Sequence, residues 1–259
     1  MANVQSFWLL LSFIIKVSMI RTASRTIPIL LLIAAITAPG LGAQNCIPVV
    51  KYYLEQSGGH APLYNGKIPP AYKQLYEGTY YLESEKYSEG SVEYNGKFYT
   101  GVLLNLNAHL DELYIRMPQY YTSSILLKQH VTSFTLGDKE FIQIKKENWP
   151  QAPDEGYYRV LYSGKDISIL KKTIKRMNNT TAASESKASH VFSESNYYYL
   201  LWNGVFHSLK GKSSFLKIFR NKRSVINHFI RENKLKFSAE EKEVSYALCA
   251  AFYEKNIMP

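Results

Sequence analysis

The six histidines of this 259-residue chain are its best candidates for binding a metal ion or transferring protons. They are His60, His109, His130, His190, His207 and His228. None belongs to a His-Glu-x-x-His pattern, and the two cysteines do not form a paired metal motif. The closest approach to a ligand cluster is His109 near Asp111 and Glu112, which we interpret as part of a turn. The sequence therefore predicts no metal site, and it contains no motif for a cofactor.

Carboxylates and nucleophiles show no catalytic pattern either. Asp111-Glu112 and Asp154-Glu155 are adjacent acids, and neighbouring residues of a strand point to opposite faces, which makes poor pairs for glycoside hydrolysis. Ser57-Gly58-Gly59-His60 reads as a glycine turn, since there is no Gly-x-Ser-x-Gly elbow, phosphate loop or dinucleotide-binding glycine pattern. The sequence therefore assigns no catalytic residue, and a hydrolase whose acids meet only in the fold stays an alternative.

Tyrosine is the distinctive chemical excess, with 21 residues that often stand side by side. Neighbouring strand residues alternate faces, so each doublet is expected to send one ring to the core and one outward. Outward tyrosine rings suit protein interfaces and sugar faces, because they combine apolar area with a hydroxyl group. Tyrosine is also common in ordinary β-sheets, and we interpret most of these tyrosines as ordinary sheet residues. The candidate binding surface consists of Tyr120, Tyr121, Tyr157, Tyr158, Tyr197, Tyr198 and Tyr199.

A four-residue motif marks the turns that connect the expected strands. Its copies are Tyr64-Asn65-Gly66-Lys67, Tyr94-Asn95-Gly96-Lys97, Tyr162-Ser163-Gly164-Lys165 and Trp202-Asn203-Gly204-Val205. Asn and Gly tolerate the positive φ angles of a type I′ turn, so Asn-Gly between β-forming residues predicts a hairpin. The copies at Asn95, Ser163 and Asn203 lie between strand patterns, whereas the copy at Asn65 is expected to be only a turn. Gly137-Asp138 predicts a further hairpin.

Helical patterns replace the strand patterns near the C-terminus. Ser224 is expected to cap one helix, and Ser238-Ala239-Glu240-Glu241 forms a capping box before another. The predicted fold class is α+β, mainly β: an antiparallel hairpin meander, as a curled sheet, barrel or sandwich, with two or three C-terminal helices packed on it.

The first 43 residues differ in composition from the rest and predict a signal or targeting segment. Two apolar runs, Phe7 to Val17 and Ile27 to Ala38, flank two arginines, and the second run has the features of a secretory signal cleaved after Ala43. An uncleaved anchor and lipidation of Cys46 are the alternatives. Met19, just before the basic region, is a second candidate for the true start.

The remaining chain divides into two further parts. Residues 44–90 are expected to form an irregular N-terminal segment, and 91–259 a β-meander domain with a helical end and a mobile loop at 178–190. Cys249 lies in an apolar helical stretch and is interpreted as a small buried residue, with a disulfide to Cys46 as the alternative.

The formal charge of +10 invites a nucleic-acid interpretation, but most of the basic residues are scattered. The densest cluster runs from Lys210 to Arg223 around an expected helix. We interpret it as a solvated basic face, and the sharper alternative is a surface for an anionic glycan or lipid.

Residues 93 to 115 contain a Tyr-Asn-Gly-Lys-Phe-Tyr hairpin followed by Leu104, Asn107, Asp111 and Leu113 at spacings that resemble uncharacterised exported proteins of the Bacteroidota. Gly156 to Lys165 and Lys222 to Phe237 show the same likeness. The resemblance implies an exported β-rich protein and carries no activity or functional residues with it.

These patterns together predict an exported cell-envelope protein, periplasmic or extracellular, acting as a non-catalytic binding or structural module. An envelope protein or a glycan is the expected kind of partner, and no nucleic acid is expected. Contact with a membrane is expected only through an N-terminal segment that stays uncleaved. The alternatives are a hydrolase of an envelope or extracellular polymer and a basic surface that binds an anionic glycan or lipid.

Overall fold

A computed structural model describes residues 46–57, 61–117, 122–179 and 189–256. The expected signal segment, Tyr120-Tyr121 and most of the loop predicted at 178–190 lie outside the described residues, and those predictions are not tested. Residues Cys46–Pro259 form one compact unit, and the description below concerns this unit alone.

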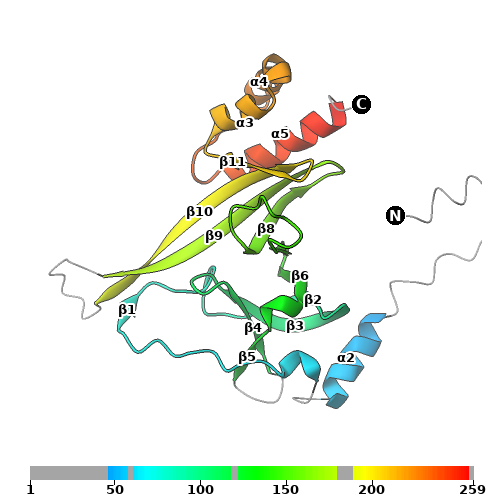
Figure 1. Cartoon of the computed structure of the whole chain (residues 1–259), viewed down its shortest axis with the longest axis vertical. Coiled ribbons are helices and arrows are strands. Elements are labelled where there is room, and N and C mark those ends of the chain that lie inside the picture. Colours follow the sequence, from blue (N-terminus) through cyan, green and yellow to red (C-terminus); the bar gives the residue numbers. More distant parts are fainter. Residues whose placement is uncertain (1–45, 58–60, 118–121, 180–188, 257–259) are drawn as a thin grey trace, which may run out of the picture. The chain divides into compact units, whose positions relative to one another are not determined.

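Eleven strands make up the sheet in the described part of the chain (Figure 1). They are β1 (Tyr76–Glu77), β2 (Ser88–Tyr94), β3 (Lys97–Asn107), β4 (Glu112–Arg116), β5 (Ser123–Ile125), β6 (Val131–Leu136), β7 (Lys139–Ile144), β8 (Gly156–Ser163), β9 (Ile167–Asn179), β10 (His190–Trp202) and β11 (Val205–Leu209). The order is β1-β10-β9-β8-β7-β6-β2-β3-β4-β5, with β11 also paired to β10. Among these described strands, only β1 and β10 pair in parallel. The mainly β fold class is confirmed, as one open, mixed sheet.

The Asn-Gly turns behave as their chemistry predicts. Asn95 and Gly96 have φ angles of 53° and 71°, and Asn203 and Gly204 have 49° and 78°, so both central positions are positive in each turn. These turns join β2 to β3 and β10 to β11. Asn65 instead ends the short helix η3 (Pro62–Tyr64) and joins no hairpin, which confirms the interpretation of that copy as a turn.

Two connections in the described ranges join strands that are not neighbours in the sheet: β1 pairs with β10 and not with β2, and β5 does not pair with β6. After β5 and the short helix η4 (Lys128–His130), the chain returns so that β6 pairs with β2. Strand β9 also meets the β3–β4 turn, since the Lys175 amide donates to the Ala108 carbonyl over 3.1 Å. Strands far apart in the sheet order therefore face one another, and the sheet has a concave side.

Four α-helices accompany the sheet in the described ranges: α2 (Cys46–Ser57), α3 (Lys212–Ile218), α4 (Arg223–Glu232) and α5 (Lys242–Asn256). The three C-terminal helices confirm the expected helical end. Helix α2 lies in the segment that was expected to be irregular. None of the helices in these ranges has both the length and the apolarity needed to cross a bilayer.

The predicted cap at Ser224 is wrong. Helix α4 begins at Arg223 and its N-cap residue Lys222 makes no side-chain capping bond, because the chain enters α4 directly from the short helix η5 (Arg220–Lys222). At the capping box, the Ser238 hydroxyl donates to the Glu241 carboxylate over 3.0 Å, and α5 begins directly after it.

The apolar core occupies both sides of the sheet. On one face, residues of β2, β3, β4 and β6 pack with Leu54 of α2 and Leu63 of η3. The opposite face buries Ile144, Tyr158, Leu170 and Tyr199. The C-terminal helices cover β9 and β10 with Phe215, Ile226 and Cys249. Cys249 is a free, fully buried thiol, which confirms its interpretation, and burial raises its pKa to about 12.

Candidate functional site

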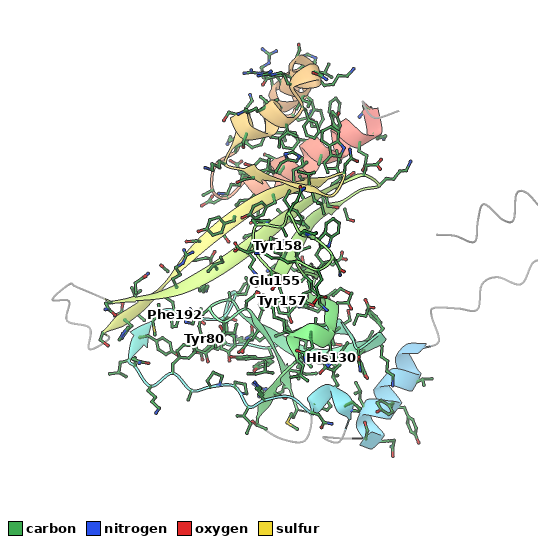
Figure 2. The ribbon with its side chains drawn as sticks, viewed as in Figure 1. Tyr80, His130, Glu155, Tyr157, Tyr158 and Phe192 are labelled. Carbon is green, nitrogen blue, oxygen red and sulfur yellow. The ribbon has the colours of Figure 1, made fainter. Side chains whose placement is uncertain are left out.

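The expected outward row of tyrosines is not present on β8. Tyr157 and Tyr158 are only 2% and 0% exposed, so the prediction that one ring of this doublet faces solvent is wrong (Figure 2). The two rings do alternate faces, but both faces are covered. Tyr157 packs edge-on against Phe134 at 5.0 Å between ring centroids, and Tyr158 packs against Tyr199 at 5.9 Å.

The triplet on β10 is also largely buried. Tyr198 and Tyr199 are 4% and 8% exposed, whereas Tyr197 is 39% exposed. The Tyr198 ring lies 5.8 Å from Tyr246 of α5, under the C-terminal helices. Of the candidate surface, only Tyr197 is exposed among the residues that the structure describes, and one ring does not form a binding row.

A different set of rings comes together where the segment before β2 meets β10. We call it the aromatic cluster, and its members are Tyr72, Tyr76, Tyr80, Tyr81, His109 and Phe192. Tyr72 stacks on Tyr80 at 4.5 Å, and the Phe192 ring lies 5.1 Å from Tyr76 (Figure 2 labels Tyr80 and Phe192). Most of these rings are half-buried. Sequence reasoning missed the cluster because its members come from distant, partly irregular segments.

A cavity of about 260 Å³ lies beside the aromatic cluster on the concave side of the sheet. Two chain segments connect them: Leu82 and Glu83 follow Tyr81, and Glu194 lies two residues beyond Phe192 on the same face of β10. The cavity is lined by Leu82, Glu83, Leu106, Lys139, Phe141, Tyr157, Arg159, Lys171, Thr173, Lys175 and Glu194. Its lining combines apolar groups with four cations and two carboxylates.

Strand register brings the cations of the cavity together. Arg159 of β8 pairs with Lys171 of β9, and Lys175, four residues further on the same face of β9, pairs with Glu194. Phe141 pairs with Arg159 from the other side. The cavity wall is therefore built from consecutive positions across β7 to β10.

Two of these cations are bound by one carboxylate. Glu243 of α5 accepts from Lys171 Nζ at 2.6 Å, from Arg159 Nη1 at 3.1 Å and from the Tyr198 hydroxyl at 3.1 Å. Burial alone would raise the pKa of Glu243, but the Lys171 hydrogen bond and the charges of Lys171 and Arg159 outweigh it and hold the pKa below its usual value. Lys171 and Arg159 therefore have a close counterion, although the buried Arg159 Nε has no hydrogen-bond partner among the described residues.

Lys175 is much less well compensated. Its side chain is 8% exposed, and the carboxylate of Glu194, its partner, lies 3.7 Å away and is itself largely exposed. Burial lowers the pKa of Lys175, and the charge of Glu194 only partly opposes this shift. Lys139 pairs with Glu83 at the more open side. Of the cavity cations, Lys175 is thus the desolvated ammonium that an additional anion would stabilise most.

A second, partly buried ion cluster includes Lys172, which lies on the same strand. In this Asp111 cluster, the Asp111 carboxylate accepts from Lys172 at 2.9 Å and from Lys128 at 2.5 Å, and the Tyr157 amide donates to it at 3.3 Å. The Lys172 ammonium also lies 5.1 Å from the centre of the Tyr158 ring. Every charged group here has close partners, which indicates a structural clamp between the β3–β4 turn and the sheet.

His109 belongs to the same turn, as expected. The amides of His109 and Leu110 both donate to the side chain of Asn107 over 3.0 Å, and His109 Nδ1 lies 2.9 Å from the Lys175 carbonyl oxygen. In the described ranges, no three His, Cys, Asp or Glu side chains come close enough together to hold a metal ion.

One feature of the sequence indicates the cavity residues, namely the lysines of β9. Lys171, Lys172 and Lys175 follow the largely apolar start of β9, Ile167-Ser168-Ile169-Leu170, and lysines on both faces of a strand that is buried on both sides are unexpected. This feature shows that charge is buried there, but the partners Glu194, Glu243 and Asp111 emerge only from the fold.

Comparisons with protein-family models, with curated proteins and with solved structures found no match to this chain.

Proposed function

We propose that this protein is an exported, non-catalytic binding protein of the cell envelope, which holds a small acidic molecule in the cavity of its curled sheet. The apolar and basic pattern of the first 43 residues supports export, as does the predicted relationship to exported proteins of the Bacteroidota. The observation that carries the binding proposal is Lys175: a buried ammonium on a cavity wall, whose carboxylate partner among the described residues, Glu194, lies 3.7 Å away.

The cavity lining defines the class of ligand. Its cationic groups are hydrogen-bond donors, so the ligand must supply acceptor oxygens, and an ionised acid also compensates the charge of Lys175. Leu106, Phe141 and Tyr157 are almost fully buried and present apolar surface to the cavity. A compact molecule with an apolar body and a carboxylate head therefore fits both parts.

Octanoate is a suitable probe, because it joins a short apolar chain to one carboxylate, and octanamide is its neutral counterpart. Calorimetric titration of the full chain should show octanoate binding at least about tenfold more tightly than octanamide. A hydrogen bond to a charged group contributes about 1.5–3 kcal/mol, which corresponds to roughly ten- to hundredfold in affinity.

Lys175→Met should remove that preference, since it keeps the volume of the side chain and deletes its charge. Lys97→Met is the matched control, because Lys97 is exposed at the β2–β3 turn and lies outside the cavity. Equal binding of octanoate and octanamide, or unchanged binding in Lys175→Met, would overturn the proposal.

A further inference from the structure

The positive charge of the described unit is concentrated in one stretch of the chain. Residues 210–236, here called the basic segment, contain nine lysines and arginines but only one carboxylate, that of Glu232, for a net charge of +8. The whole sequence has +10, and three of these charges precede Cys46, which leaves +7 for residues 46–259. The rest of the unit therefore has a net charge of −1.

These cations face solvent instead of pairing with acids. The exposed ones are Lys210, Lys217, Arg220, Lys222, Arg223, Arg231, Lys234 and Lys236. Among the ion pairs of the described residues, only the one between Lys236 and Glu241, at 3.6 Å, includes a lysine or arginine of the basic segment, and Glu232 lies 3.1 Å from His228. On their other side, α3 and α4 bury Phe215, Ile226 and Ile230 in the core. The segment thus combines a fixed apolar side with an uncompensated cationic side.

Helix stability does not explain the two cations at the start of α4, although Lys217 and Arg231 lie in last turns, where the helix dipole favours a cation. Lys222 is the N-cap of α4 and Arg223 its first residue, and the first turn contains no acid. The positive end of a helix dipole lies at its N-terminus, where a cation typically costs about 0.3–1 kcal/mol. These cations oppose the helix dipole and repel one another. An external anionic partner would explain their positions.

Exposed aliphatic side chains accompany the charges. Val225 in α4 is 46% exposed, and Val244 and Leu248 in α5 are 62% and 43% exposed. Helices α4 and α5 pack together, with Phe229 stacked on Phe252 at 4.1 Å. The headgroup region of a bilayer interacts favourably with both kinds of group, because cations bind lipid phosphate and aliphatic groups reach the acyl boundary. A polyanion dissolved in water provides no apolar surface for the aliphatic groups to bind.

We propose that the basic segment binds the surface of a bilayer rich in anionic phospholipid. Each Lys or Arg near such a surface contributes about 1 kcal/mol, so removal of four cations should weaken binding far more than tenfold. Binding should also fall steeply with salt, because the Debye length shrinks from about 10 Å at 0.1 M to about 3 Å at 1 M. This site is independent of the cavity.

Vesicle co-sedimentation of the full chain tests the proposal, with phosphatidylcholine vesicles that either contain or lack phosphatidylglycerol. The neutral vesicles measure any contribution of the apolar N-terminal runs, which is common to all variants. The charge variant combines Lys217→Gln, Arg220→Gln, Lys222→Gln and Arg223→Gln. Its matched control removes the same charge from exposed lysines outside the segment, through Lys73→Gln, Lys86→Gln, Lys97→Gln and Lys146→Gln.

The expected result is salt-sensitive binding to the anionic vesicles that falls at least tenfold in the charge variant and stays close to wild type in the control. Val225→Ser should weaken it further by a smaller factor, and circular dichroism should show that all variants fold. Equal loss in the charge variant and its control would overturn the proposal. So would binding to heparin that matches vesicle binding and is unaffected by Val225→Ser, since that result indicates an anionic glycan.

Discussion

Two lysines three residues apart on β9 are both buried, yet their surroundings differ. Lys172 lies 2.9 Å from Asp111, whose carboxylate also accepts from Lys128 and from the Tyr157 amide. Lys175 lies 3.7 Å from the exposed Glu194 and faces a cavity. Burial lowers the pKa of each ammonium, and the nearby carboxylate opposes that shift in both cases. The difference teaches that burial of a charge does not by itself identify a site: the close, complete partners of Lys172 indicate structure, and the loose partner of Lys175 indicates binding.

The largest effect is expected from Asp111→Asn. The change leaves Lys172 buried without its counterion, and breaking a buried ion pair from one side typically costs about 3–5 kcal/mol. Urea unfolding measures the loss, and Glu194→Gln, the corresponding change at Lys175, should cost much less. Adding Lys172→Met to Asp111→Asn should restore part of the stability. Similar losses for Asp111→Asn and Glu194→Gln would contradict the distinction between the two lysines.

Glu243→Gln should cost about 2–3 kcal/mol, because Lys171 and Arg159 lose their charged partner. The folded-state pKa of Glu243 is depressed, so its contribution is present above the ordinary carboxyl pKa and is lost as the pH falls through the folded value. Unfolding measured from pH 7 downward should show this loss in wild type and a flatter profile in Glu243→Gln. Parallel profiles would show that Glu243 is not a paired group.

Gly156→Ala should destabilise the protein by about 2 kcal/mol. Gly156 has a φ of 126°, which side-chain-bearing residues rarely adopt, and a Cβ there would overlap with the Asp111 carboxylate and the Lys172 ammonium. Thermal unfolding measures the effect. Gly96→Ala is an informative control, since Gly96 also has a positive φ but has no atom near its Cβ position. A smaller loss of stability for Gly156→Ala than for Gly96→Ala would show that the Asp111 cluster rearranges at little cost in free energy.

The smallest effect on stability is expected from Lys175→Met, which should leave the free energy of unfolding unchanged or raise it by up to about 1 kcal/mol at pH 7. The pKa of Lys175 is lower in the folded protein, so its ammonium disfavours folding below the ordinary lysine pKa of 10.5, and this penalty fades as the pH rises. Unfolding between pH 7 and 10 should therefore show the variant's advantage shrinking. A large loss of stability would make Lys175 structural, like Lys172.

The candidate site was harder to predict than the elements that build it. The lysines of β9 could be recognised in the sequence as charges that follow the apolar start of a strand, but Glu194, Glu243 and Asp111 come from β10, α5 and a distant turn. The tyrosine prediction failed for a related reason. Alternation along β8 is correct, but whether the second face meets solvent or another layer depends on segments far away in the chain.

The sequence by itself determined the features that depend on neighbouring residues. The Asn-Gly hairpins, the helical C-terminal end and the apolar character around Cys249 follow from local φ preferences and side-chain patterns. Only the tertiary structure decided that β6 returns to β2, that the sheet curls until Lys175 meets Ala108, and that Lys172 is paired while Lys175 is not. These outcomes depend on packing between residues distant in sequence, and local turn chemistry contains no information about it.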